Sequence, residues 1–434
     1  MKAPKQMLVL LYGAEIGTIE EVGSRRFIFR YLDAWREEGP GIPLSLSMPL
    51  TQAEYSGAIA EAYLAGLLPD NPQILQALAR DAPYKVSPNN PFALLTYVGE
   101  ECPGAVQFVV PDRLQEAATE GSIEWLDETG VAEALARARR GLPPVQRGSR
   151  VGQFSLPGAQ PKTALYRERT ETAERWGVPS GRTPTTHILK PPIPDLDGQV
   201  ENEHFCLNLA RELGLKAALS EVRMFGDEKA IVVDRYDRYP GSDGRLLRSH
   251  QEDMCQALGI HPRKKYERDG GPGVSTIVHD VLRASAASRE NVEDDVRRFI
   301  DSIVFNWIIA GTDAHAKNFS ILHDQGGRHR LAPLYDLNSA LPYYDVQQVK
   351  MSLKVDGHYD MSLQPRHWER LAKDCRIEPE EVLTTARRFL AETADAASTV
   401  VTKCKASGLT HPVLQKLREA LAARCGALRA AGYA

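Results

Sequence analysis

The sequence predicts an α+β protein with two lobes, a β-rich lobe followed by a helical lobe, and an extra amino-terminal α/β subdomain before them. From about Arg150 to Arg238 the chain is strand-rich and contains one clear helix. From about Ser249 onward, apolar residues recur mostly at helical spacing. The expected divisions are residues 1–110 for the subdomain, 111–238 for the β-rich lobe and 239–434 for the helical lobe.

Length and composition indicate a soluble protein of several domains. With 434 residues, two or three domains are expected, and 43% hydrophobic and 25% charged residues are ordinary values. The net charge of -4 gives no overall attraction to nucleic acid, although a local basic patch is compatible with it. The six cysteines contain no CxxC pair, which argues against a zinc or redox motif and for reduced thiols.

No segment predicts a membrane span or an export signal. The apolar run Met7–Tyr12 is too short for a signal peptide and is soon followed by Glu15. No stretch approaches the ~18 apolar residues that cross a bilayer. We therefore expect a cytoplasmic protein that has no membrane partner.

The first 140 residues supply elements but no candidate catalytic residue. Met7–Tyr12 and Phe27–Tyr31 have strand patterns, and Glu54–Leu68 has apolar residues at helical spacing. A further helix is expected at Val131–Arg140, and Gly141-Leu142-Pro143-Pro144 breaks it.

The first candidate binding element is the segment Val151–Thr163. It is expected to open as a strand, turn on Ser155–Gly158 and return as the strand Lys162–Leu165. Backbone amides in such a turn can bind phosphates, because glycine allows close approach. The match to a kinase glycine-rich loop is loose, so a plain hairpin turn is the alternative. The candidate phosphate-binding residues are Gly158, Ala159, Gln160 and Lys162.

A lysine and a helix follow this segment. Lys190 ends the strand His187–Lys190, about thirty residues after the loop, which suits a lysine that binds α- and β-phosphates. Its partner is expected on the next helix, with Glu203 preferred and Glu201 as the alternative. Acids in a first turn also simply complement the helix dipole.

Ala230–Val233 reads as a buried strand that runs into the charged segment Asp234–Arg238 between the lobes. There Asp234 and Tyr236 are candidates to contact an adenine. Asp237 and Arg238 are interpreted as a charged strand end. Further on, Lys264–Val274 is charged and then glycine-rich, and it predicts an exposed, mobile loop.

Expected helices of the second lobe are Val296–Ala310, Val382–Glu392 and Leu414–Ala431. The first of them should position the most informative segment, Gly311–Asn318. This segment contains Asp313 five residues before Asn318, the spacing of the protein-kinase catalytic loop.

A second acid strengthens that hypothesis. Two short strands after Asn318 predict a hairpin that brings Asp336 back to it, and these two oxygen ligands suit magnesium. Asp313 is the expected catalytic residue, and Lys317 could neutralise the transferring phosphoryl group. His315 is a cofactor-binding candidate, although packing within the loop is its more ordinary role. The alternative for the segment is a polar helix-to-strand turn. The predicted fold is therefore bilobal and protein-kinase-like.

Together these residues resemble the HipA family of serine/threonine kinases, the toxins of bacterial toxin–antitoxin pairs. The similarity extends over about residues 150–340, and the order and spacing of its blocks agree. The matching blocks are Ser155–Thr163, His187–Lys190, Glu201–Leu215, Asp234–Arg238, His250–Asp253, Gly311–Ser320 and Ala332–Asp336.

The resemblance implies ATP and Mg²⁺ as cofactors, with Lys190 on ATP, Asp313 as the catalytic Asp, and Asn318 and Asp336 on the metal. It places Ser155 at the autophosphorylated loop serine, whose modification in the family ejects the loop. It also implies a helix-turn-helix antitoxin (HipB-like) as partner, operator DNA bound mainly through it, and protein substrates such as aminoacyl-tRNA synthetases. The alternatives are a small-molecule or lipid kinase and an ATP-binding co-repressor scaffold.

Overall fold

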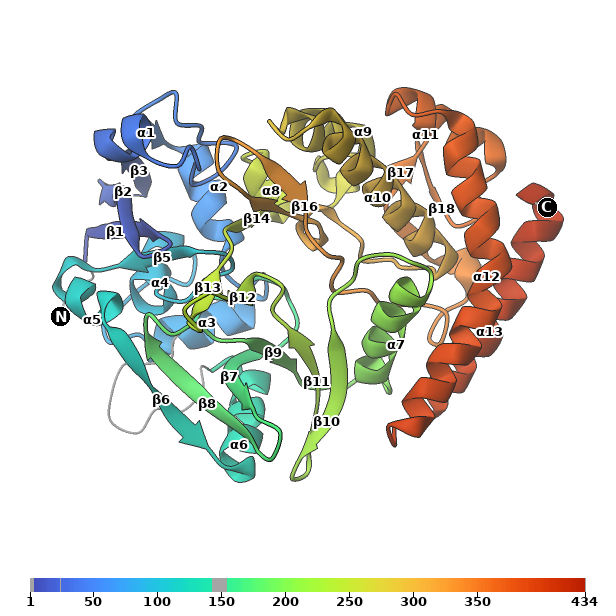
Figure 1. The fold of residues 1–434 in the computed structure, drawn as a ribbon, viewed down its shortest axis with the longest axis horizontal. Coiled ribbons are helices and arrows are strands. Elements are labelled where there is room, and N and C mark those ends of the chain that lie inside the picture. The colour runs from blue at the N-terminus through green and yellow to red at the C-terminus, as the bar shows by residue number, and fades with distance from the viewer. Residues whose placement is uncertain (1–3, 24, 143–153, 434) are drawn as a thin grey trace. The chain divides into compact units, whose positions relative to one another are not determined.

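The computed structural model describes residues 4–23, 25–142 and 154–433 (Figure 1). These residues form two compact units. Unit 1 contains Met1–Pro191, Arg223–Arg263 and Ile321–Arg328, and unit 2 contains Pro192–Val222, Lys264–Ser320 and His329–Ala434. In the described part of the chain, no helix is long and apolar enough to cross a membrane.

Unit 1 begins with a five-stranded antiparallel sheet over an apolar core. Its strand order is β4-β3-β2-β1-β5, and Phe27, Phe29 and Phe108 are among its buried side chains. The sequence predicted β1, β3 and a helix at Glu54–Leu68, of which the start forms β4. The elements are β1 (Gln6–Leu11), β2 (Ala14–Val22), β3 (Arg26–Tyr31), α1 (Asp33–Glu38), β4 (Glu54–Ser56), α2 (Ala58–Gly66), α3 (Pro72–Asp81), α4 (Pro91–Val98), β5 (Val106–Val109) and α5 (Leu114–Ala118).

A second sheet has the order β10-β11-β9-β7-β8-β6. The helix α6 contributes Val131 and Leu135 to the apolar core of this sheet. There they belong to one cluster with Leu165, Trp176 and Leu189 of the strands. A strand was expected to begin at Val151, but residues 151–153 lie outside the described residues. The elements are β6 (Glu120–Leu126), α6 (Glu128–Arg139), β7 (Thr163–Arg169), β8 (Glu174–Gly181), β9 (His187–Lys190), β10 (Ser220–Phe225), β11 (Glu228–Asp234), β12 (Arg238–Pro240), β13 (Leu246–Arg248), β14 (Gln251–Asp253) and α8 (Met254–Ala257).

Unit 2 is mainly helical. The long helices α12 and α13 run side by side, and α10 and α11 pack on α12 (Figure 1). Between α10 and α11 lie the two short strands that the sequence predicted, β15 and β16, and a hairpin, β17–β18, that it did not predict; most of β15 belongs to unit 1. The elements are α7 (Gln199–Glu212), α9 (Val274–Thr276), α10 (Arg289–Ile308), β15 (Ser320–His323), β16 (His329–Leu331), β17 (Lys350–Val355), β18 (His358–Asp360), α11 (Pro365–Asp374), α12 (Pro379–Ala406) and α13 (Pro412–Leu428).

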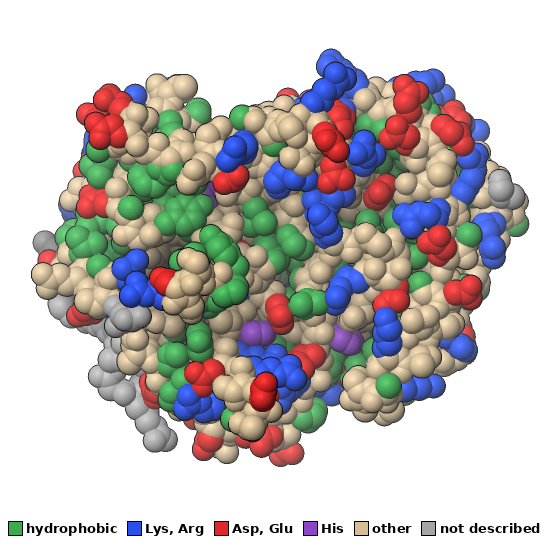
Figure 2. Space-filling model, viewed as in Figure 1, with side chains coloured by type: hydrophobic (Ala, Val, Ile, Leu, Met, Phe, Trp, Pro, Cys, Tyr) green, Lys and Arg blue, Asp and Glu red, His purple; other side chains and the backbone are tan. Residues whose placement is uncertain are grey.

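Charged side chains of both signs are interspersed over the face shown in Figure 2, as the small net charge suggests. The interior of unit 1 also contains charged side chains. We call this group the Glu101 cluster, and its members are Glu101, Arg235, Asp237, Arg238 and Arg248. Arg235 binds both oxygens of Asp237, with N–O distances of 2.8 and 3.1 Å. Arg235 and Arg238 each donate to Glu101 Oε1, at 3.0 and 3.1 Å, and Arg248 binds Glu101 Oε2.

The members of the Glu101 cluster are at most 9% exposed, so their charges are paired away from water. Burial alone would raise the pKa of Glu101, but Arg248, Arg238 and Arg235 outweigh it and lower the pKa to about 2. The resulting stability is present above the ordinary carboxyl pKa and is lost as the pH falls toward 2. Asp237 and Arg238, interpreted from the sequence as a charged strand end, are buried ion-pair partners, and Arg238 begins β12.

We expect Glu101→Gln to lower the free energy of unfolding by about 3–5 kcal/mol, because it leaves buried arginines without their anion. Glu168→Gln is the matched control, since it removes the exposed partner of Arg175 and should cost ~1 kcal/mol or less. Urea unfolding followed by circular dichroism measures both changes. Equal effects of the two substitutions would contradict the role given to the cluster.

Candidate active site

The candidate catalytic loop begins where the buried helix α10 ends. The apolar face of α10 is almost fully buried, and Phe299, Ile303 and Trp307 are at most 1% exposed. The helix and its apolar spacing follow the sequence prediction, but it is longer than expected, because it begins at Arg289 instead of Val296 and ends at Ile308. A helix held by so much buried apolar surface presents its carboxyl end at a fixed place in unit 2.

Two sets of hydrogen bonds define the carboxyl end of α10. Arg424 of α13 donates to the carbonyl groups of Trp307 and Ile308, at 2.9 and 3.0 Å, and so caps the helix. Gly311 N then donates to the Asn306 carbonyl at 2.7 Å, and a Cβ on Gly311 would lie 2.3 Å from Asn306 Oδ1. Ala310, with a φ of 51°, turns the chain out of the helix, and a side chain at position 311 would displace the side chain of the buried Asn306.

The loop Asp313–Asn318 is closed by its own hydrogen bonds. His315 N donates to the Asp313 carbonyl at 2.8 Å, and Asn318 N donates to the His315 carbonyl at 2.9 Å. Asn318 Nδ2 also donates to the Asp313 carbonyl, at 2.6 Å. The side-chain nitrogen of Asn318, Nδ2, is thus bonded within the loop, which leaves the side-chain oxygen, Oδ1, as the atom that could bind a metal ion. The carboxyl group of Asp313 is 56% exposed and can meet a substrate.

The second acid is tied to the same loop through Tyr335. Tyr335 Oη donates to the Lys317 carbonyl at 2.8 Å and lies 2.6 Å from Ser320 Oγ. Asp336 follows Tyr335 in the sequence, and Asn318 follows Lys317. The hydrogen bond between Tyr335 and Lys317 therefore holds together the two segments that carry the predicted metal ligands. Asp336 has a φ of 57°, in the left-handed region that Asp and Asn tolerate.

Sequence reasoning missed Tyr266. Its hydroxyl group donates to Asp313 Oδ1 at 2.6 Å, and its ring meets the His315 ring edge-on at 4.9 Å. The Lys265 carbonyl accepts from Ala316 N at 3.2 Å. The prediction that Lys264–Val274 forms an exposed, mobile loop was therefore wrong in its first residues, which contact the candidate catalytic loop. The pattern Lys-Tyr-Glu between charged residues gave no signal of this contact.

In unit 1 the loop serine is packed against the amino-terminal subdomain. Ser155 is 1% exposed, its N–H donates to the Glu101 carbonyl at 2.8 Å, and its hydroxyl group donates to the Leu67 carbonyl at 2.6 Å. The Gly158 carbonyl accepts from Asp70 N at 3.1 Å. Among the described residues, this segment bonds to the subdomain and does not form the expected hairpin with β7.

Gly158 has a φ of 104°, which favours glycine, and a Cβ there would lie 2.7 Å from Lys162 Nζ. Lys162 in turn donates to the Pro157 carbonyl at 2.9 Å. The turn therefore brings a lysine ammonium group close to glycine backbone, which is a suitable arrangement for an anion.

The remaining loop candidates lead toward Lys190. The Ala159 carbonyl accepts from Asn71 at 3.4 Å, and Gln160 Nε2 donates to the Pro191 carbonyl at 3.3 Å. Lys190 precedes Pro191, ends β9 and is 7% exposed. The structure therefore brings Gln160 to the end of the strand that carries Lys190.

The end of β11 carries the predicted adenine-contacting residues. Asp234 Oδ1 lies 3.2 Å from Nε2 of His187, its partner on β9. Tyr236 Oη donates to Gln251 Oε1 at 2.5 Å and is partly buried. Both side chains therefore have defined positions in unit 1, and their contact with a nucleotide stays a prediction.

Two acids near the start of α7 are buried, since Glu201, in the first turn, is 1% exposed and Glu203, in the second turn, is 0% exposed. Gln199 Nε2 donates to Glu203 Oε2 at 3.5 Å, and Asn202 Nδ2 donates to the Ser339 carbonyl at 2.8 Å. Burial favours a specific role for these acids over a solvated position at the helix amino terminus. The pairing of Glu203 with Lys190 stays a prediction.

We expect Tyr266→Phe to loosen the contact between the segment around Lys265 and the catalytic loop, because it removes only the hydroxyl donor to Asp313. Hydrogen exchange at the Ala316 amide, which bonds to the Lys265 carbonyl, should become faster. Tyr344→Phe is the matched control, since Tyr344 is 56% exposed. Unchanged exchange in Tyr266→Phe would show that the hydroxyl bond does not hold the segment.

Comparisons with known proteins give the family. A model described as the HipA-like C-terminal domain matches residues 154–399, and one described as the HipA N-terminal domain matches residues 7–109. The protein Y4mE of Sinorhizobium fredii is 36% identical over 380 residues, 86% of each chain. The serine/threonine-protein kinase toxin HipA of Shewanella oneidensis is 31% identical over 345 residues, 77% of this chain and 74% of the relative.

A solved structure confirms the predicted fold. The HipA, HipB and operator DNA complex of Shewanella oneidensis MR-1 contains a chain that matches this one with a TM-score of 0.78 and 23% identity. The match covers 98% of this chain and 97% of that one. The α+β, kinase-like fold is therefore confirmed, and the chain belongs to the HipA family of kinases.

Proposed function

We propose that this chain is an ATP- and magnesium-dependent serine/threonine protein kinase that arrests growth as the toxin of a toxin–antitoxin pair. The main support is the closed loop in which Asn318 Nδ2 donates to the Asp313 carbonyl. Tyr335, the residue before Asp336, bonds to the same loop at the Lys317 carbonyl. That arrangement supplies a half-exposed carboxylate beside two oxygen ligands, the constellation that phosphoryl transfer needs.

The donor set fits magnesium. Asn318 offers an amide oxygen and Asp336 a carboxylate, and Mg²⁺ prefers oxygen ligands completed by waters and phosphate oxygens. When bound, the ion neutralises negative charge on the phosphates. Lys317 adds positive charge at the loop, and Lys190 is the proposed ligand of the α- and β-phosphates.

Asp313 orients the attacking hydroxyl group and accepts its proton. The hydroxyl oxygen forms a bond to the γ-phosphorus, the bond to the β,γ-bridging oxygen breaks, and ADP leaves. The hydrogen bond from Tyr266 occupies one carboxylate oxygen, Oδ1, and so fixes the carboxyl group for this role.

The proposal extends to regulation and partners. Ser155 is the proposed autophosphorylation site. Because its hydroxyl group is buried on the Leu67 carbonyl, the segment must leave the subdomain before Ser155 can react. The related Shewanella oneidensis chain is solved with HipB and operator DNA, which supports a HipB-like antitoxin as partner and DNA contact mainly through it. The six cysteines are buried and form no disulfide among the described residues, which is compatible with the proposed cytoplasmic location.

We expect Asp313→Asn to reduce autophosphorylation by about 10²–10⁴-fold, because the amide cannot accept the hydroxyl proton. Incorporation of radiolabel from γ-labelled ATP measures it. Asp395→Asn, an exposed position on α12, should behave as the wild type. Labelling of the Asp313→Asn variant at the wild-type rate would contradict the catalytic role proposed for Asp313.

Asp336→Asn should weaken binding of Mg-ATP far more than binding of magnesium-free ATP. Asn tolerates the left-handed backbone at this position, so the variant tests the charge without straining the turn. Calorimetry with ATP, with and without Mg²⁺, separates the two affinities. An equal loss in both would show that Asp336 has a structural role only.

Phosphate at Ser155 adds about -1.5 to -2 charges beside a triphosphate site. Ser155→Asp should therefore bind ATP more weakly and be less toxic on expression, whereas Ser155→Ala should bind ATP but lose the main autophosphorylation site. Mass spectrometry of the wild type after incubation with Mg-ATP is the direct check. Phosphate found elsewhere, with Ser155 unmodified, would refute self-inactivation at this serine and leave the kinase assignment intact.

A further inference from the structure

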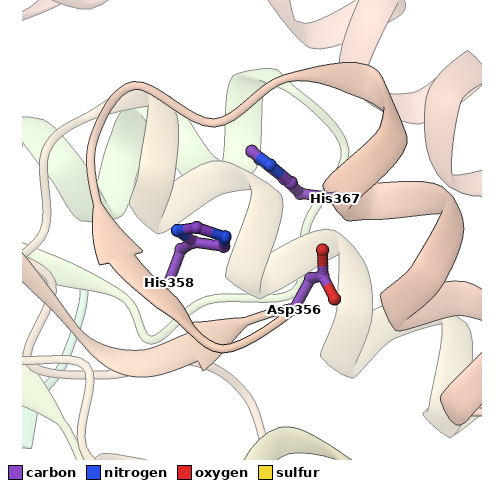
Figure 3. Close-up of side chains that lie close together, drawn as sticks. All are labelled: Asp356, His358 and His367. Carbon is purple, nitrogen blue, oxygen red and sulfur yellow. The ribbon is translucent and has the colours of Figure 1, made fainter.

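A cluster of two histidines and one aspartate lies in unit 2, away from the Asp313 loop in sequence (Figure 3). Asp356, His358 and His367 each offer one ligand atom, and these atoms all lie within 4.8 Å of one another. The two imidazole rings are stacked, with centroids 4.5 Å apart and an angle of 29° between their planes. Nothing in the proposed phosphoryl transfer uses these three side chains.

Two of the three residues are held by rigid local structure. Asp356 and Gly357, with φ of 50° and 80°, form the two-residue turn of the β17–β18 hairpin, whose last pair is Val355 with His358. His367 lies in the first turn of α11, is 8% exposed, and accepts from Gln364 N through Nδ1 at 3.1 Å. The cluster is therefore built on a tight hairpin and a helix start.

Local structure does not explain His358. The turn accounts for Asp356, which also pairs with Arg370 at 3.0 Å, and the helix start accounts for His367. His358 is exposed, yet its ring lies flat on His367 and beside the carboxyl group of Asp356 (Figure 3). An exposed histidine placed with a buried histidine and a carboxylate is an arrangement that a shared cation would explain.

The ligand types identify the class of cation. Imidazole nitrogens suit zinc and related first-row ions, whereas Mg²⁺ and Ca²⁺ prefer oxygen ligands only. Two histidines and one carboxylate are a known ligand set of zinc, with water at the open position. We propose that Asp356, His358 and His367 bind one divalent transition-metal ion of the zinc type.

Binding has a defined local cost. If the ion takes Nε2 of His367, the proton of the neutral ring moves to Nδ1, and the bond from Gln364 N is lost. Arg370 must also share the carboxylate of Asp356 with the ion. Each is a single hydrogen bond, and the metal–ligand bonds replace them.

The site would act on the element that supports the catalytic loop. On β17, Ser352 Oγ donates to the Thr312 carbonyl at 2.6 Å, and Lys354 N donates to Glu267 Oε2 at 2.7 Å. These contacts reach the residue before Asp313 and the residue after Tyr266. A metal ion at the hairpin turn would stiffen that support, and this consequence, unlike the metal binding, rests on the proposed function.

The test uses tag-free, chelator-treated full-length protein in excess Mg²⁺, which occupies the proposed Asn318 and Asp336 ligands. Calorimetric titration with Zn²⁺ should give one ion per chain, and Co²⁺ should give the visible absorption of a low-coordinate site. His358→Ala and Asp356→Asn should each weaken Zn²⁺ binding at least tenfold. His279→Gln, which changes a histidine elsewhere in unit 2, should leave it unchanged.

Thermal unfolding provides a second readout, since Zn²⁺ should raise the Tm of the wild type and not that of His358→Ala. Because His358 is exposed, its replacement should leave the metal-free Tm unchanged. No Zn²⁺ binding, or binding that both variants retain, would overturn the site. All measurements omit ATP, so a chain that transfers phosphate but binds no Zn²⁺ refutes the metal site alone.

Discussion

The way in which α10 ends is the constraint on which the candidate catalytic loop depends. The helix cannot shift, because its apolar face is buried, and Arg424 caps its last carbonyl groups. Burial lowers the pKa of Arg424 to about 10, which still leaves the cap charged at neutral pH. Ala310 then turns the chain with a left-handed backbone, and the loop closes on itself through Asn318. Asp313 is therefore presented by a backbone that needs little reorganisation, which is the condition for electrostatic catalysis.

Unit 1 combines a rigid charged core with a lightly held segment. Glu101 belongs to both: its carboxylate pairs with buried arginines, and its carbonyl group accepts from Ser155 N. Neutral hydrogen bonds that also hold the segment include the Ser155 hydroxyl bond to the Leu67 carbonyl, the bond from Asp70 N to the Gly158 carbonyl and the bond from Asn71 to the Ala159 carbonyl. Each neutral hydrogen bond is worth about 1 kcal/mol net, whereas breaking a buried ion pair costs several. The proposed release of Ser155 would therefore break bonds of the weaker kind and leave the buried ion pairs in place.

The sequence predicted the parts of the site that are local in the chain. The helix before Asp313, the five-residue spacing to Asn318 and the return to Asp336 all depend on periodicity and short separations, and the structure has that helix and that hairpin. The contacts that were missed join distant residues. Tyr266 lies 47 positions before Asp313, and Glu101 lies 134 before Arg235, so no local pattern marks either contact. The strands β17 and β18 were missed because the surrounding sequence is dominated by helical periodicity, and β2 was missed because its glutamates weaken the strand pattern.

The central claim is that Asn318 and Asp336 hold the metal of a nucleotide complex beside Asp313. A crystal structure with Mn²⁺ and a non-hydrolysable ATP analogue, with the metal located by anomalous scattering, tests it most directly. The account predicts an anomalous peak within coordination distance of Asn318 Oδ1 and the Asp336 carboxylate, with the γ-phosphate facing the Asp313 carboxyl group. A nucleotide and metal bound away from these residues would contradict it.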